Sequence, residues 1–151
     1  MGYSGVGFFA LKTGRDLREK ARADLADLVA HPLDSCAAFN FFVTARHVPE
    51  WHFGTTQGGQ VIESTPTLRI CRHLGDGAKH FTLTAKKHTQ VEDVVRHDGV
   101  FDAAVFDATA FDVPGLIVRL EPQEAKAAGL TETVGAVVLA RHVMRELDGL
   151  F

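Results

Sequence analysis

The sequence predicts a mainly α-helical fold: an antiparallel four-helix bundle with a small antiparallel β-hairpin insert before the last helix. Apolar residues recur at helical spacing up to about residue 81 and again after residue 122. Alternating and β-branched stretches gather between these two parts. The chain has 151 residues, of which 46% are apolar and 23% charged, as is typical of a globular protein, so we expect one domain over residues 1–151.

The first helix is expected at about residues 15–30, where apolar residues occupy one face and charged residues the other. We expect His31 to end this helix. The reason is that His31 precedes Pro32, and a residue before a proline avoids the α region.

The second helix is expected at about residues 34–48, with Asp34 or Ser35 as its cap. Pro49 should end or kink it, because proline lacks the amide hydrogen that a helix interior uses. Apolar residues cover this segment nearly all round, so we place the helix at the centre of the bundle.

Residues 54–66 are rich in glycine and threonine, so we expect a loop there. The third helix is expected at about residues 67–81, although Gly75 and Gly77 lower its helix propensity. Glycines inside a helix often allow another backbone to approach closely, and a break of the helix at these glycines is the alternative.

The β insert is expected at about residues 82–120, with Pro114 and Gly115 in a turn before the final strand. The last helix is expected at about residues 123–149, with Gly129 as a point of interruption. The strand-like stretches are HFTLTA, TQVEDVV, GVFDAAVFDAT and GLIVRL.

Charge and cysteine content limit the function classes. The net charge of −3, with histidines neutral, argues against a broad basic surface for nucleic acid. No apolar run reaches the roughly 20 residues that cross a membrane. We interpret Cys36 and Cys71 as reduced thiols of the core, which favours the cytoplasm.

The third helix carries the most informative polar pattern. Arg69, His73, Asp76 and His80 share one face at helical spacing, and Arg72 flanks them. This stripe is either a solvated outer face, a polar groove facing another helix, or a metal site. The spacing lacks a recognised metal-binding signature, so we expect neither a metal nor another cofactor.

The second helix has a narrower polar stripe of Asn40, Thr44 and His47 on an otherwise apolar surface. Buried polar groups need partners, and the third helix offers them. The two stripes either form a hydrogen-bonded seam that fixes helix register or line a shared pocket. That pocket would consist of Asn40, Thr44, His47, Arg69, His73, Asp76 and His80.

The stretches AFNFFVTARHVPEW and LRICRHLGDGAKHF, with a β insert and a last helix after them, resemble a group of small bacterial proteins to which we attach no function. The helical layout is also similar to the HEPN superfamily of four-helix bundles. That resemblance implies an RNase, a nucleotide-binding module or an inactive scaffold. HEPN RNases carry an Arg followed by four to six residues and a His, which Arg46 and His52 match, although Pro49 lies between them.

Two function classes follow from these patterns. The first is a binding or interaction module that contacts a protein partner or a second copy of itself. The alternative is a HEPN-like RNase or nucleotide-acting enzyme, which the net charge does not favour. In it, His80 or His73 would act as general acid or base, Asp76 would orient the histidine, and Arg69 or Arg72 would hold a phosphate.

Overall fold

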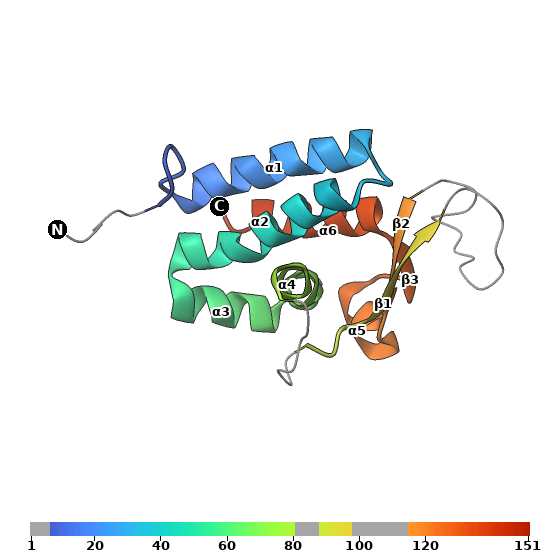
Figure 1. The fold of residues 1–151 in the computed structure, drawn as a ribbon. Helices are drawn as coiled ribbons and strands as arrows, with labels where there is room; N and C mark the ends of the chain where they lie inside the picture. The colour runs from blue at the N-terminus through green and yellow to red at the C-terminus, as the bar shows by residue number, and fades with distance from the viewer. Residues whose placement is uncertain (1–6, 81–87, 98–114) are drawn as a thin grey trace.

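The computed structural model describes residues 7–80, 88–97 and 115–151 (Figure 1). This part of the chain is mainly helical and includes a small antiparallel sheet, which confirms the prediction of a mainly α-helical chain with some antiparallel β structure. The elements in order are α1 (Gly14–Ala30), α2 (Ser35–Phe53), α3 (Thr55–Ser64), α4 (Pro66–Lys79), β1 (Val91–His97), β2 (Gly115–Leu120), α5 (Pro122–Ala128), β3 (Thr133–Gly135) and α6 (Ala136–Asp148).

The first helix follows the prediction. Thr13 caps α1, and its hydroxyl accepts from the Asp16 amide while the Asp16 carboxylate accepts from the Thr13 amide. His31 is the C-terminal cap, as the following proline predicted. The residues that α1 buries include Leu17 and Leu28, and the helix lies along α2 (Figure 1).

Helix α2 lies centrally, as predicted, and contacts α1, α3, α4 and α6 (Figure 1). The Asp34 side chain caps it by accepting from the Cys36 amide. Of the two outcomes expected at Pro49, an end or a kink of the helix, the end is wrong, because α2 continues to Phe53. Pro49 is itself buried, so packing around it offsets the backbone hydrogen bond that a proline removes.

The loop predicted at residues 54–66 is wrong, because most of it forms α3. The glycines that suggested a loop allow close packing instead. A Cβ on Gly58 would lie 2.6 Å from the Glu50 Cα and from the Pro49 carbonyl oxygen, so only glycine lets α3 rest directly on the backbone of α2.

The sheet has the order β1–β2–β3, and both pairs are antiparallel. Strands β1 and β2 confirm the strands predicted in the stretches TQVEDVV and GLIVRL. The helix expected over residues 123–149 is interrupted at Gly129, as predicted, because Gly129 ends α5 in the left-handed region with φ of 69°. The prediction missed β3, which adds to the sheet between α5 and α6. The predicted strands HFTLTA and GVFDAAVFDAT, and the turn before Gly115, fall largely or wholly outside the described residues.

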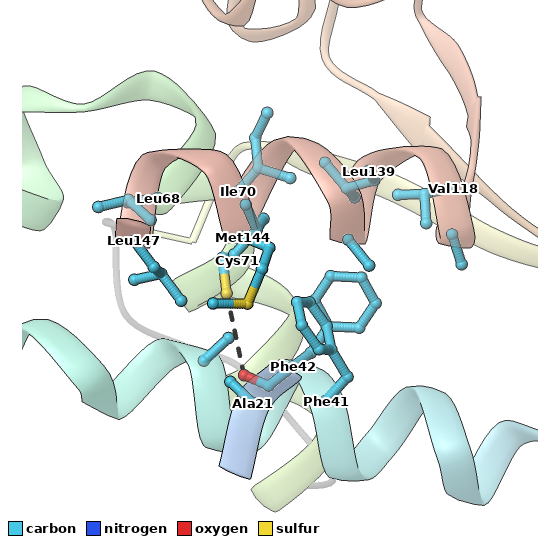
Figure 2. Close-up of a cluster of buried hydrophobic side chains, with 14 of the residues drawn as sticks. Ala21, Phe41, Phe42, Leu68, Ile70, Cys71, Val118, Leu139, Met144 and Leu147 are labelled. Atoms are coloured by element: carbon cyan, nitrogen blue, oxygen red, sulfur yellow. Dashed lines mark hydrogen bonds between the residues drawn. The ribbon is translucent and has the colours of Figure 1, made fainter. Parts of the chain in front are cut away.

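The core joins the helices to the sheet. Figure 2 shows Leu139, Met144 and Leu147 of α6 among side chains of α2 and α4, with Val118 of β2 at one end. Cys71 lies inside this core, and its thiol donates a long hydrogen bond to the Phe42 carbonyl, with Sγ and oxygen 3.9 Å apart. Cys36 is exposed, so the prediction of a core thiol is right for Cys71 and wrong for Cys36.

Candidate functional site

A chain of ionisable side chains joins α2 to α4. Gly75 makes the contact close, since a Cβ there would lie 2.7 Å from the Phe42 carbonyl oxygen and 2.8 Å from the Arg46 Cβ. Arg46 of α2 then reaches Asp76 of α4, with Nε and Oδ1 2.6 Å apart. Its Nη1 also lies 3.0 Å from Glu50 Oε1, so one guanidinium bridges two carboxylates.

The second oxygen of Asp76 accepts a hydrogen bond from His88, which lies just before β1, with Oδ2 and Nε2 2.7 Å apart. Only 9% of the Asp76 side chain and 5% of the His88 side chain are exposed. Burial alone would raise the pKa of Asp76, but the hydrogen bonds from Arg46 and His88 outweigh it and lower that pKa. Asp76 is therefore a charged acceptor at neutral pH.

His73 ties α4 to the start of β1. Its Nδ1 accepts from the backbone amides of Gln90 and Val91, at 3.2 and 3.3 Å. Burial lowers the pKa of His73, and the neighbouring His88, whose ring centroid is 5.6 Å away, lowers it further. The neutral ring therefore carries its proton on Nε2 and acts as a hydrogen-bond donor.

His47 occupies the outer end of the same chain. Its Nδ1 lies 3.3 Å from Glu50 Oε2, and its Nε2 lies 3.1 Å from Lys79 Nζ. Burial lowers the pKa of His47, and the positive charges of Arg46 and Lys79 add to this effect. A neutral ring that donates from Nδ1 to Glu50 and accepts from Lys79 at Nε2 satisfies both contacts.

The seven residues expected to line one pocket are all described, and they do not come together. Thr44 is directed to α1, where it donates to Asp24 and accepts from Lys20. Asn40 and His80 are exposed. Of the seven, only His47, His73 and Asp76 belong to the polar contacts described above. The prediction failed for the others because helical spacing shows which residues share a face but not which element that face contacts.

The two arginines expected to hold a phosphate contact carboxylates of other elements. Arg69 lies 3.1 Å from Glu124 of α5, and Arg72 lies 2.8 Å from Glu63 of α3. Both positions tie α4 to its neighbours.

The two residues that match the HEPN spacing, Arg46 and His52, have different partners. The Arg46 guanidinium is engaged by Asp76 and Glu50. The His52 ring lies against Phe151 near the C-terminus, with centroids 4.0 Å apart. The two side chains do not share partners in the part of the chain that the structure describes.

Sequence reasoning missed several residues that build this region. Arg46 and Glu50 could have been found, because they stand at the i, i+4 spacing of helical ion pairs. His88 is 12 residues from Asp76 in the chain, outside any periodic segment, so no local signal identifies it.

A groove of about 620 Å³ opens beside this chain of contacts, between α2 and α4 on one side and the β1–β2 strands on the other. Its walls are mostly apolar and include Phe39, Leu74, Ala78 and Val94. His73 is among its polar lining residues. The side chains of Phe39 and Val94 are 45% and 59% exposed, so the groove gathers apolar surface that the fold leaves uncovered.

Among the residues with described positions, no group of three or more His, Cys, Asp or Glu side chains is arranged to hold a metal ion. Within the same ranges, no helix has the length and apolar character needed to cross a membrane. Comparison of the chain with protein-family models, with curated proteins and with solved structures gave no match.

Proposed function

We propose that this chain is a binding module whose ligand occupies the groove between α2, α4 and β1. The groove itself is the observation that carries the proposal. It combines two exposed large apolar side chains, Phe39 and Val94, with the polar side chain of His73. Covering apolar surface stabilises a complex by about 25 cal/mol per Å², and a few fixed polar groups orient the ligand.

The state of His73 favours binding over proton transfer. Its Nδ1 lone pair is occupied by two backbone amides, and its lowered pKa keeps the ring neutral. Such a ring is a fixed donor for a carbonyl or another acceptor of the ligand. It is a poor general base, because its acceptor nitrogen is already in use.

The test uses Nile red, an uncharged apolar dye, and follows its fluorescence on titration with the protein. Ala78→Trp places a bulky ring at an exposed position in the groove wall and should weaken dye binding at least about tenfold. Ala26→Trp is the matched control, at an exposed position on α1 that does not line the groove. Equal binding by the two variants would refute the proposal.

One observation favours a second candidate, the HEPN-like nucleotide-acting enzyme. His88 is held at Nε2 by Asp76, and among the described residues its buried Nδ1 has no hydrogen-bond partner. An acidic residue that orients a histidine is the arrangement used for general acid–base chemistry. In this reading, α1, α2, α4 and α6 correspond to the helices of a HEPN-like four-helix bundle, and Arg46 is the cation beside the histidine.

The second candidate predicts cleavage of single-stranded RNA or hydrolysis of ATP. His88→Gln keeps a donor near the position of Nε2 for Asp76 but cannot transfer a proton, so activity should fall about 100-fold or more. His142→Gln on α6 is the control. Equal activity of wild type and His88→Gln in the same preparations would exclude the enzyme.

The cellular setting is also a proposal. Cys36 and Cys71 are both free thiols, and Cys36 is exposed, which supports a reducing compartment such as the cytoplasm.

The partner in the groove is a protein segment on another chain, and a second copy of this chain qualifies.

A further inference from the structure

We infer that the groove binds an extended segment of a partner protein, which adds as a strand to the open edge of β1. This inference rests on the proposed binding function and names the kind of ligand. Such strand addition uses backbone hydrogen bonds for affinity and pockets for alternate side chains for specificity.

The shape of the groove supports a ligand that follows the strand. Six consecutive residues of β1, 91–96, line the groove. Side chains of a strand alternate between its two faces, so the groove follows β1 along its length, and residues 116–118 of β2 also line it. In the described part of the sheet, β2 is the neighbour of β1 on one side, and no strand pairs with its other edge.

The Val94 backbone amide lies at that edge and is bonded to a side chain of its own strand. The Val94 amide donates to the side chain of the preceding residue, Asp93, with nitrogen and Oδ1 2.8 Å apart. This amide is therefore bonded outside the ladder with β2. In the free protein the Asp93 carboxylate therefore occupies the Val94 amide, and charged side chains often protect sheet edges in this way. A backbone carbonyl of the partner can replace the carboxylate as acceptor.

The side chains of the groove specify the chemistry of the partner. Glu92 and Asp93 are exposed carboxylates on β1 and line the groove together with Arg96, so carboxylates outnumber cations two to one on this strand. Phe39, Leu74 and Val94 supply apolar surface. A segment in which apolar residues alternate with lysine or arginine would place its apolar side chains among these residues and its cations near the carboxylates.

Two protein variants and one peptide pair test the inference. Val94→Pro removes the edge amide while sparing the ladder with β2, because proline is tolerated where an edge N–H faces outward. Val94→Ile keeps the amide and is the matched control. The probe is a fluorescein-labelled hexapeptide of alternating valine and lysine, measured by fluorescence anisotropy. Its partner peptide carries N-methyl groups on alternate residues, so it lacks the donors that a paired strand needs.

We expect saturable binding of the unmodified peptide to wild type and to Val94→Ile. Binding should be at least about tenfold weaker for Val94→Pro, and equally weaker for the N-methylated peptide on wild type. The N-methylated peptide leaves the protein unchanged, so this comparison holds even where Val94→Pro disturbs folding. Circular dichroism of Val94→Pro identifies such a disturbance.

The outcomes separate this inference from the proposed function. If Val94→Pro and the N-methylated peptide bind as well as their controls, or if no alternating peptide binds while Nile red does, strand addition is wrong and the groove remains a binding site. If Ala78→Trp leaves Nile red binding unchanged, the groove is not a binding site, and the inference fails with it.

Discussion

Asp76 is the residue on which the contact between α2 and α4 depends most. It accepts from Arg46 through one oxygen and from His88 through the other, and all three side chains are largely buried. Removing one partner of a buried ion pair leaves the other charge without compensation. Asp76 is therefore the position where a single substitution tests the whole group.

Asp76→Ala should lower the free energy of unfolding by about 3–5 kcal/mol, because Arg46 would stay buried without its closest carboxylate. Urea denaturation followed by circular dichroism measures the change. The control is Asp148→Ala, which removes a carboxylate whose side chain is 41% exposed and which pairs with Arg22. A surface ion pair contributes about 0–1 kcal/mol, so similar losses in both variants would contradict the buried role of Asp76.

His73 makes stability depend on pH. Its pKa in the folded protein is below the ordinary value of 6.5, mainly because of burial, and the pKa of His47 and of His142 is lowered as well. As pH falls below 6.5, the unfolded chain takes up protons that the folded chain does not, so the folded state loses stability. The loss ends once pH is below the folded-state pKa values. The pKa values of Glu50 and Asp76 lie below their ordinary values of 4.5 and 3.8, so these carboxylates stay charged above about pH 5.

His73→Asn should reduce this pH dependence, because the asparagine Oδ1 lies near the position of Nδ1, can accept from the two β1 amides and does not titrate. Thermal unfolding measured at several pH values between about 5 and 7.5 gives the slope for each protein. His80→Asn, at an exposed position after the same helix, serves as the control and should keep the wild-type slope. An unchanged slope in His73→Asn would show that this ring does not resist protonation.

At the scale of elements, glycines determine how closely the helices meet α2. A Cβ on Gly75 would lie within 2.8 Å of the Phe42 carbonyl oxygen and the Arg46 Cβ. A Cβ on Gly59 of α3 would meet nothing within 4 Å. The two glycines lie inside helices, so they separate the effect of packing from that of helix propensity.

Gly75→Ala should destabilise the protein by about 1–3 kcal/mol, because the methyl group forces α2 and α4 apart. Gly59→Ala should stabilise it by about 0.5–1 kcal/mol, since alanine favours a helix and open space surrounds it. The two midpoints of urea denaturation therefore move in opposite directions. A gain in stability for Gly75→Ala would show that the helices do not approach as closely as described.

Long periodic elements could be predicted from the sequence, whereas short ones could not. Helices α1, α2 and α4 have enough turns for their apolar residues to define a face. Helix α3 is ten residues long and contains two glycines, and β3 is three residues long, so tertiary packing decides their form. The candidate site shows the same limit: the polar faces of α2 and α4 were visible, but the neighbours of each side chain were not. His88 joins Asp76 only through the path of the chain.

At the scale of the whole molecule, Cys71 reports global unfolding. It is fully buried, and burial raises its pKa to about 12, so it reacts only when the core opens. We expect Ellman's reagent to label Cys36 rapidly in the native protein. The labelling rate of Cys71 should instead be set by how often the protein unfolds. Cys36→Ser leaves Cys71 as the single thiol and makes this measurement direct. Rapid labelling of native Cys36→Ser would mean that the core opens locally.

The cations and carboxylates that join α2 to α4 balance each other, with Lys79 and Arg46 against Glu50 and Asp76. Added salt therefore acts on two parts of the molecule differently. Mobile ions screen the exposed carboxylates of β1 at physiological ionic strength, over a Debye length of about 8 Å, but reach the enclosed Arg46–Asp76 pair far less. Ionic strength should thus change how fast a charged molecule arrives at the groove while leaving the helices that form it in place.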